Sequence, residues 1–311
     1  MVNHMAMDDL RKNDFLLYED VKYFLNPKYV FVPIKNADMG KILVKDRSYV
    51  YKNDKIVDSD IPRYSSISGT VLGVKNMPFK DGDYESIVIE NDFKENVRKR
   101  VSAKKRIKDY TSGEVINLLT KFGIDIELFG KGRLYINTLD KNIPINKYIY
   151  KDMVEKLFYT IDKLVSVFDY EMAYVLVRDE DKPTKRALTK EARYHPFIKI
   201  KLVDDNSIDV GNNTLIDINL VYKIYKLLKR RTPISEVYFT ILGDGVSVNN
   251  IFYVKKYSLI SELFFNNCDF LDKSVDVYLD DNNVSSLKYV IDDNMRYIQI
   301  NKKKVSELGL K

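Results

Sequence analysis

Residue types that commonly carry chemistry are scarce in this chain of 311 residues, which holds one cysteine, Cys268, and two histidines, His4 and His195. An iron–sulfur cluster needs four cysteine ligands, so this chain cannot hold one, and Cys-rich structural zinc sites are excluded for the same reason. The short motifs of zinc proteases, serine hydrolases and P-loop nucleotidases do not occur in the sequence. We expect no metal site and no catalytic residue, with Cys268 an ordinary, partly buried thiol and His195 a structural or surface residue.

One short glycine-containing segment has residue types that could hold a phosphate. Phe129-Gly-Lys-Gly-Arg133 places two glycines beside two basic side chains. Glycine allows backbone N–H groups to approach a phosphate closely, and the basic side chains would add positive charge. Gly130, Lys131, Gly132 and Arg133 are therefore the predicted cofactor-binding residues, and a simple turn is the alternative interpretation.

The charge pattern bears on partners. The chain has 51 basic and 45 acidic residues, a net charge of +6, and both signs are interleaved along most of its length. Three basic runs stand out, at 94–108, 226–231 and 302–304. No aromatic residues suited to base stacking are interleaved with them, so we expect no nucleic acid partner. An anionic membrane surface or an acidic protein is the alternative use of these runs.

Composition and hydropathy favour a protein of the reducing cytoplasm. Hydrophobic residues make up 45% and charged residues 31%, which is ordinary for globular domains. Disulfides are excluded by the single cysteine. No apolar run reaches the length of a transmembrane helix, and the N-terminal residues lack the apolar segment of a signal peptide. We expect a cytoplasmic protein that is at most peripheral at the inner face of a membrane.

Short strands separated by turns dominate the first third of the chain and predict a small barrel or sandwich. An amphipathic segment over 8–24 precedes them and is expected to form a leader helix or arm. Ser68-Gly69 is expected to be a turn, because glycine adopts positive φ without strain. The expected strands are 29–34, 41–44, 49–51, 55–57, 64–74 and 84–89.

The pattern then changes to alternating helices and strands. A helix over 115–122 is expected to have Ser112 as its N-cap and Gly123 as its C-cap. The later helices are expected at 152–168, 216–228 and 258–265, from apolar residues three or four apart. The later strands are expected at 134–136, 174–177, 197–202, 236–242, 250–254, 275–279, 288–291 and 296–300.

Several segments, taken in chain order, carry a family resemblance. They are Ile67–Val74 (I-S-G-T-V-L-G-V), Leu134–Asn137 (L-Y-I-N), Arg178–Pro183 (R-D-E-D-K-P), Thr240–Val246 (T-I-L-G-D-G-V) and Ser261–Leu263 (S-E-L). Together they resemble the RnfC family, the NADH-side subunits of ion-pumping ferredoxin:NAD reductase complexes. That family is related to NqrA of the sodium-pumping quinone reductase and to the flavin-binding subunit of respiratory complex I.

The resemblance implies an α+β, multi-domain fold. Residues 1–25 would be an N-terminal arm, and 26–95 a barrel-sandwich hybrid domain like those of biotinyl and lipoyl proteins. Residues 96–240 would form an α/β domain resembling the complex I flavin subunit, with a basic connector at its start. Residues 241–311 would hold a β-grasp (SLBB-like) domain and the C-terminal tail. Lys75 is the nearest candidate for a modified carrier lysine, and we do not expect it to be modified.

Departures from the family pattern shape the functional expectation. The glycine-rich flavin loop is reduced to residues 130–133, and the paired acids are reduced to Asp140, with Ile143 at the second position. We therefore expect a cofactor-less paralogue, a non-catalytic subunit that docks membrane redox-complex subunits. The alternatives are an oxidoreductase that still binds FMN or NADH through the reduced loop and Asp140, and a free-standing module that binds a small ligand or a protein. Whether the protein is an enzyme stays open at this point.

Overall fold

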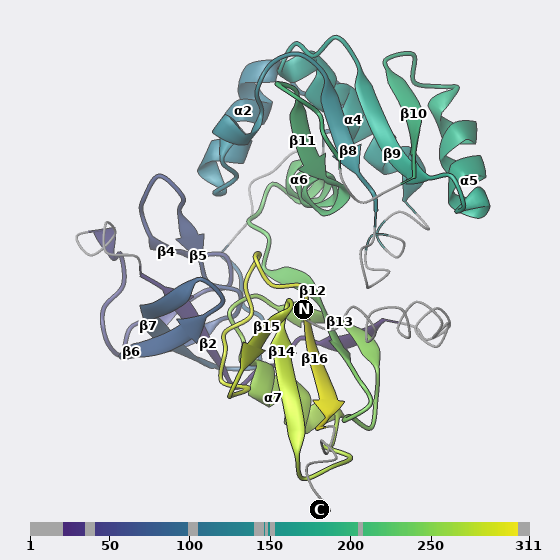
Figure 1. Ribbon diagram of the computed structural model, residues 1–311. Helices are drawn as coiled ribbons and strands as arrows, with labels where there is room; N and C mark the ends of the chain where they lie inside the picture. Colours follow the sequence, from purple (N-terminus) through teal and green to yellow (C-terminus); the bar gives the residue numbers. More distant parts are fainter. Residues whose placement is uncertain are drawn as a thin grey trace, which may run out of the picture. The chain divides into compact units, whose positions relative to one another are not determined.

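The computed structural model describes residues 21–34, 41–98, 105–139, 153–204 and 208–303, together with Asn146 and Ile149. They fall into two compact units, each considered by itself (Figure 1). One unit holds the described residues of 105–234, and the other joins those of 21–98 to 235–303. The first unit is thus inserted between two segments of the second. The expectation of a mixed α+β protein is confirmed at this coarse level.

A four-stranded parallel sheet forms the centre of the inserted unit. Its strands are β8 (Leu134–Asn137), β9 (Ala173–Arg178), β10 (Ile198–Val203) and β11 (Thr214–Asp217). The spatial order is β10-β9-β8-β11, so the chain builds the sheet outward from β8 to one side and then adds β11 on the other. The direction of strand addition therefore reverses between β8 and β11.

Among the described residues, where Asn146 and Ile149 are also helical, four α-helices and two short 3₁₀ helices with defined bounds accompany this sheet. They are α2 (Ser112–Lys121), α4 (Val154–Val167), α5 (Lys182–Ala192), α6 (Ile218–Arg230), η3 (Ile107–Asp109) and η4 (Ile126–Leu128). Helix α4 buries Leu157, Ile161 and Leu164 and contacts β9, β10 and the other three helices. The apolar residues whose spacing predicts a helix over 152–168 form the face of α4 that packs on the core of the unit.

The start of α2 corrects one expectation. Thr111, and not Ser112, is the N-cap: its hydroxyl accepts from the N–H of Glu114, whose carboxylate accepts from the N–H of Thr111. This reciprocal capping box needs the acid three residues after the cap, which selects Thr111. The helix ends at Lys121 with Phe122 as its C-cap, so Gly123, the expected C-cap, follows one residue later, with φ +79°.

Helix α5 and strand β11 of the inserted unit were not expected from the sequence, and neither were the short helices η3 and η4. Helix α5 is largely polar and therefore lacks a strong apolar periodicity, although Asp181 caps it by accepting from the N–H of Thr184 at 3.2 Å. Strand β11 runs directly into α6, and Asp217 both ends the strand and caps the helix. A local pattern does not separate a four-residue strand from the helix that follows it at once.

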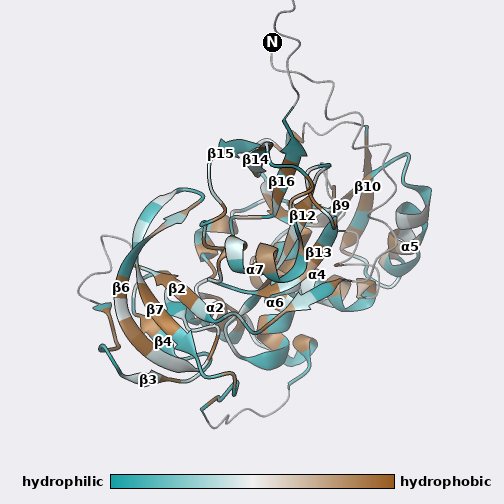
Figure 2. Ribbon diagram, turned by 90° about the horizontal axis from the view of Figure 1, so that it is seen from below, coloured by the Kyte–Doolittle hydropathy of each residue, from teal (hydrophilic) through white to brown (hydrophobic). Residues whose placement is uncertain are grey.

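The second unit begins with a four-stranded antiparallel sheet and a two-stranded one. The first has the order β2-β7-β6-β3 and the second pairs β4 with β5. The bounds are β2 Tyr29–Pro33, β3 Tyr49–Val50, β4 Lys55–Val57, β5 Arg63–Tyr64, β6 Gly69–Phe79 and β7 Gly82–Asn91. Figure 2 shows apolar residues along β6 and β7, which form a long hairpin.

Three expectations for this segment need correction. The predicted strand 41–44 is reduced to a single bridge between Ile42 and Val57. The predicted segment 64–74 divides into β5 and β6, but not at the turn expected at Ser68-Gly69. Gly69 is not in a turn but begins β6, where a Cβ atom would lie 1.8 Å from the carbonyl oxygen of Glu90. The glycine is needed for close approach of two strands, not for positive φ.

A six-stranded mixed sheet completes the second unit, in the order β1-β13-β12-β16-β14-β15. Its strands are β1 Lys22–Phe24, β12 Glu236–Leu242, β13 Asn250–Lys255, β14 Val275–Leu279, β15 Asn282–Val284 and β16 Tyr297–Lys302. Helix α7 (Ile260–Asn267) follows β13. Strand β16 lies between β12 and β14, parallel to β12.

Two further expectations are corrected in this sheet. Residues 22–24 of the predicted leader helix form β1, which pairs in parallel with β13, whereas residues 8–20 lie outside the described part of the chain. The predicted strand 288–291 is not a strand. Val290 and Ile291 are buried, and their N–H groups donate singly to the carbonyls of Pro78 (2.9 Å) and Ser258 (2.8 Å).

One hydrophobic cluster joins the two segments of the second unit. Phe31 and Ile89 of the antiparallel sheet belong to the same cluster as Phe239 and Phe252 of the mixed sheet. The N–H of Phe31 also donates to the carbonyl of Tyr257 at 2.9 Å. Segments 26–95 and 241–311, predicted as separate domains, therefore lie in one compact unit with a shared core.

Candidate functional site

The predicted phosphate loop, residues 130–133, lies between η4 and β8 and is held by hydrogen bonds within the unit. Gly132 has φ +88°, a conformation that favours glycine. The N–H of Arg133 donates to Oδ1 of Asn213 at 2.9 Å, and its guanidinium pairs with Glu171 at 3.3 Å. Gly130 and Lys131 are exposed. These contacts are those of an ordered turn, and phosphate binding by Gly130–Arg133 stays a prediction.

The loop also lies at the amino end of β8. Open parallel sheets bind ligands beyond the carboxyl ends of their strands, where the strand order reverses. Here that point lies between β8 and β11, at Asn137 and Asp217, which are direct neighbours in the register. Asp140, the remaining predicted cofactor-binding residue, follows β8 by three positions and lies outside the described residues.

Polar groups at this carboxyl edge are engaged in local structure. Oδ1 of Asn137 accepts from the N–H of Leu139 at 2.9 Å, and the hydroxyl of Thr138 donates to the carbonyl of Leu176 at 2.5 Å. Oδ1 of Asp217 accepts from the N–H of Asn219 at 2.8 Å, as the cap of α6. The edge lies where open parallel sheets bind ligands, and the hydrogen bonds of these three side chains fix its local backbone.

His195 is structural, as expected. Its side chain is 2% exposed and lies between two carboxylates, with Nδ1 bonded to Asp162 and Nε2 at 3.3 Å from Glu191. The rings of Phe158 and Tyr159 approach it edge-on. The histidine therefore links α4 and α5 to the loop before β10, and the sequence offered no sign of its two acidic partners.

Cys268 is also as expected. It is 4% exposed, and burial raises the pKa of its thiol to about 11. A thiol is nucleophilic as the thiolate, so this cysteine is inert at neutral pH. Among the described residues, no group of three or more His, Cys, Asp and Glu side chains could hold a metal ion.

A buried ionic cluster in the second unit was not anticipated from the sequence. Lys255, which is 1% exposed, lies 2.8 Å from Glu95 and 3.2 Å from Glu236. Lys52 pairs with the same two carboxylates. Burial lowers the pKa of Lys255. Burial by itself would raise the pKa of Glu236, but the charges of Lys255 and Lys52 outweigh it and the pKa is lowered. The cluster ties β12 and β13 to the segments that carry Lys52 and Glu95.

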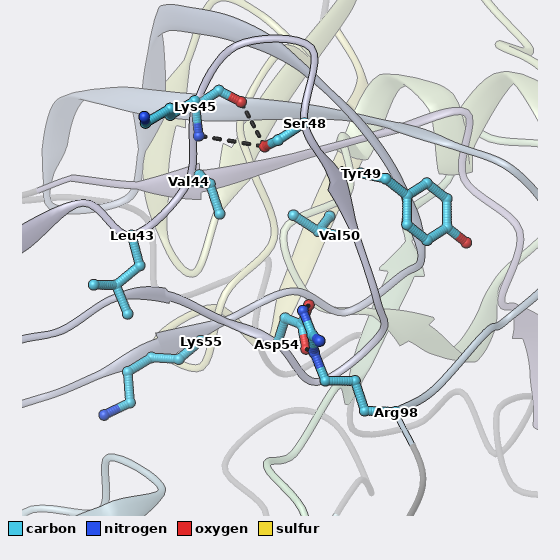
Figure 3. Close-up of a pocket in the computed structure, with 9 residues that line it drawn as sticks. All are labelled: Leu43, Val44, Lys45, Ser48, Tyr49, Val50, Asp54, Lys55 and Arg98. Atoms are coloured by element: carbon cyan, nitrogen blue, oxygen red, sulfur yellow. Dashed lines mark hydrogen bonds and ion pairs between the residues drawn. The ribbon is translucent and has the colours of Figure 1, made fainter.

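Close to this cluster along the chain, a pocket of about 480 Å³ opens in the same unit (Figure 3). Its lining combines apolar and cationic side chains. The lining residues are Leu43, Val44, Lys45, Ser48, Tyr49, Val50, Asp54, Lys55 and Arg98. The guanidinium of Arg98 forms a two-point pair with Asp54, at 2.7 and 3.1 Å, and lies over the ring of Tyr51. The volume of the pocket lies within the range of small-molecule sites.

No known protein family and no curated protein matches the sequence. Among solved structures, the chain is similar to an NAD⁺-reducing [NiFe]-hydrogenase in the air-oxidized state, with a TM-score of 0.44 and 8% identity over 56% of this chain and 41% of that one. The H₂-reduced state gives a TM-score of 0.44 and 8% identity, over 55% and 40%. The chain thus spans about two fifths of the structures it matches.

The geometry therefore offers two places for a ligand: the carboxyl edge of the parallel sheet in the inserted unit and the pocket of the second unit. The first could have been anticipated, because Leu134–Asn137 and Asp140 were recognised from the sequence. The second depends on residues from 43 to 98 that are brought together by backbone pairing, such as the N–H of Leu43 donating to the carbonyl of Ile56 at 2.9 Å. No local motif marks it.

Proposed function

We propose that this protein is an RnfC/NqrA-like, non-catalytic subunit of a membrane electron-transport complex, where it docks or positions a redox partner. The observation that carries the proposal is the topology of the sheet around α7. A hairpin, β12–β13, is followed by a helix, and the last strand, β16, returns to the centre beside β12. This is the strand order of a β-grasp domain, which the family resemblance implies for 241–311, although most of β12 lies in the segment 96–240 that was predicted as the α/β domain.

The other sheets support the same proposal. The antiparallel strands β2–β7 fall in the segment for which the resemblance implies a barrel-sandwich domain, and the parallel sheet falls in the segment for which it implies a domain like the flavin subunit. The non-catalytic role is supported by the turn at 130–133, where the N–H of Arg133 already donates to Asn213 and which lies at the amino end of the parallel sheet. Among the described residues, no helix is long and apolar enough to cross a membrane.

The test has two parts. The purified protein is titrated with FMN and NADH and followed by visible absorbance and flavin fluorescence. The non-catalytic proposal expects no spectral change, whereas bound flavin or NADH oxidation would contradict it. The tagged protein is then cross-linked in cells and isolated with its neighbours. We expect membrane redox subunits among them, and their absence would contradict the docking role.

A second candidate function, a small-ligand-binding module, is favoured by the pocket in Figure 3. Its apolar lining residues Leu43 and Val50 and its cationic residues Lys45 and Lys55 would suit a small amphipathic anion. A thermal-shift screen of such anions tests it. A shift that Leu43→Asp, at an exposed lining residue, abolishes would support the pocket, and the absence of any shift would count against it.

A further inference from the structure

Two basic runs that are far apart in the sequence meet on one surface of the inserted unit. The end of the first run is η3 with its flanking residues, and the second run is the end of α6. The hydroxyl of Tyr110 donates to the carbonyl of Leu228 at 2.7 Å, which holds the two segments together. Helix α4 is the third element of this surface: Nζ of its Lys163 donates to the carbonyls of Tyr110 (2.8 Å) and Lys108 (3.1 Å).

We call this the basic surface. Its cations are Lys105, Arg106, Lys108, Lys163, Lys229, Arg230 and Arg231. Lys105 lies over the ring of Tyr110 at 5.0 Å, and the nearby charges of Arg231 and Lys105 oppose the rise that burial causes in the pKa of Tyr110. Tyr110 is therefore the point on which the three elements converge.

The charge of the basic surface is strongly one-sided. Two of its cations pair with carboxylates, Lys105 with Glu114 at 2.5 Å and Arg106 with Asp109 at 2.9 Å. From Ile218 to Arg231 the sequence of α6 and its cap contains no acidic residue. Cations in the last helical turn stabilise a helix through its dipole, which accounts for Lys229 and Arg230. It does not account for Lys108, which belongs to η3, whereas Lys163 is engaged with the carbonyls of Lys108 and Tyr110.

We infer that the basic surface binds the anionic headgroups of a membrane. Protein partners are usually held by apolar or aromatic anchors at the centre of an interface. In the segments 105–110 and 225–231, which supply six of the seven cations, every large apolar side chain is buried or half-buried. A layer of mobile anionic headgroups needs no such anchor and adapts to long, flexible basic side chains.

This inference extends the proposed membrane role to the lipid itself, and the experiment uses protein-free vesicles so that its outcome is independent of redox subunits. The full-length protein is sedimented with phosphatidylcholine vesicles that contain phosphatidylserine, and with phosphatidylcholine alone. We expect binding only to the first, and loss of that binding as salt rises from about 0.15 to about 0.5 M, because screening shortens the range of the attraction.

The variant Lys108→Gln with Arg230→Gln removes one exposed cation from each of the two segments. We expect its partition onto anionic vesicles to fall roughly 25-fold, since each cation contributes roughly fivefold. The matched control is Lys190→Gln with Lys199→Gln, two exposed lysines on α5 and β10. It loses the same charge and should partition within about twofold of the wild type.

Equal binding to both vesicle types, no binding to either, or equal losses in the two variants would overturn the inference. Urea unfolding of both variants tests a structural role. Loss of Arg230 from the last turn of α6 should lower the stability of Lys108→Gln with Arg230→Gln only slightly, because an exposed cation gains little from the helix dipole. Salt-sensitive retention on polyglutamate resin without vesicle binding would overturn the lipid assignment and indicate an acidic protein partner instead.

Discussion

At the scale of single residues, Lys255 is a charged side chain that is almost completely buried. An ammonium group that is 1% exposed is tolerated only because two carboxylates accept its hydrogen bonds. These carboxylates come from Glu95, in the first segment of the second unit, and Glu236, in the last. The buried charge of Lys255 is therefore compensated in part by Glu95, which lies 160 positions away in the chain.

Removing one member of the cluster leaves buried charge uncompensated. We expect Lys255→Met to lower the free energy of unfolding by about 3 kcal/mol, measured by urea titration. The variant Lys255→Met with Glu236→Met should lose less than the sum of the two single changes, because it restores neutrality. Lys55→Met is the control: it breaks the exposed Lys55–Asp58 pair (2.7 Å) and should change stability by less than about 1 kcal/mol. Similar losses in both single-lysine variants would refute the role of burial.

The same cluster predicts a dependence of stability on pH. The lysines hold the pKa of Glu236 below its ordinary value of 4.5 in the folded protein. A carboxylate with a lowered folded pKa contributes stability above its unfolded pKa, and that contribution is lost as pH falls through the folded pKa. The stability gap between the wild type and Glu236→Gln should therefore be widest near about pH 6 and narrow toward about pH 3. Glu85→Gln, an exposed carboxylate of β7, corrects for the change in net charge, and a gap that is constant with pH would contradict the assignment.

At the scale of elements, short-range sequence patterns predicted most helices and strands well. The strands at 236–242 and 275–279 match β12 and β14, and the helix at 152–168 matches α4 to within two residues at each end. The misses have physical reasons. Polar α5 lacks an apolar stripe, β11 merges with α6, and the buried Val290 and Ile291 form single hydrogen bonds in place of a ladder.

The cap of α2 gives a direct test of one correction. We expect Thr111→Ala to lower the free energy of unfolding by about 1 kcal/mol, because the N–H of Glu114 loses its acceptor. Ser112→Ala, one residue later, should change it by only a few tenths of that amount. Urea titration of the two variants distinguishes the caps, and a larger loss from Ser112→Ala would restore the original expectation.

Gly69 tests the close approach of β6 and β7. We expect Gly69→Ala to destabilise the protein by about 2 kcal/mol or more, because its Cβ would lie 1.8 Å from the carbonyl oxygen of Glu90 and must separate the strands. Gly113→Ala is the matched control in α2, where a Cβ meets nothing within 4 Å. It should stabilise by up to about 1 kcal/mol through helix propensity. Thermal unfolding measures both, and a neutral Gly69→Ala would show that the strands can move apart.

At the scale of the whole molecule, the two compact units should unfold with some independence. We expect two transitions in differential scanning calorimetry, since proteins with separate units depart from two-state behaviour. Lys255→Met should lower the midpoint of one transition and Thr111→Ala that of the other, because the two residues belong to different units. A single transition that both variants shift equally would show that the units unfold together.

The sequence by itself determined most of the local elements and the exclusion of iron–sulfur clusters. These depend on residue type and on spacing over a few positions, which a linear pattern records. Only the tertiary structure decided that residues 21–98 and 235–303 share one core, that Lys255 meets Glu95 and Glu236, and that the basic runs ending at Lys108 and Arg231 meet at Tyr110. These arrangements rest on contacts between residues that are on the order of a hundred positions apart in the chain, which buried area and long-range hydrogen bonds select and local propensity does not encode.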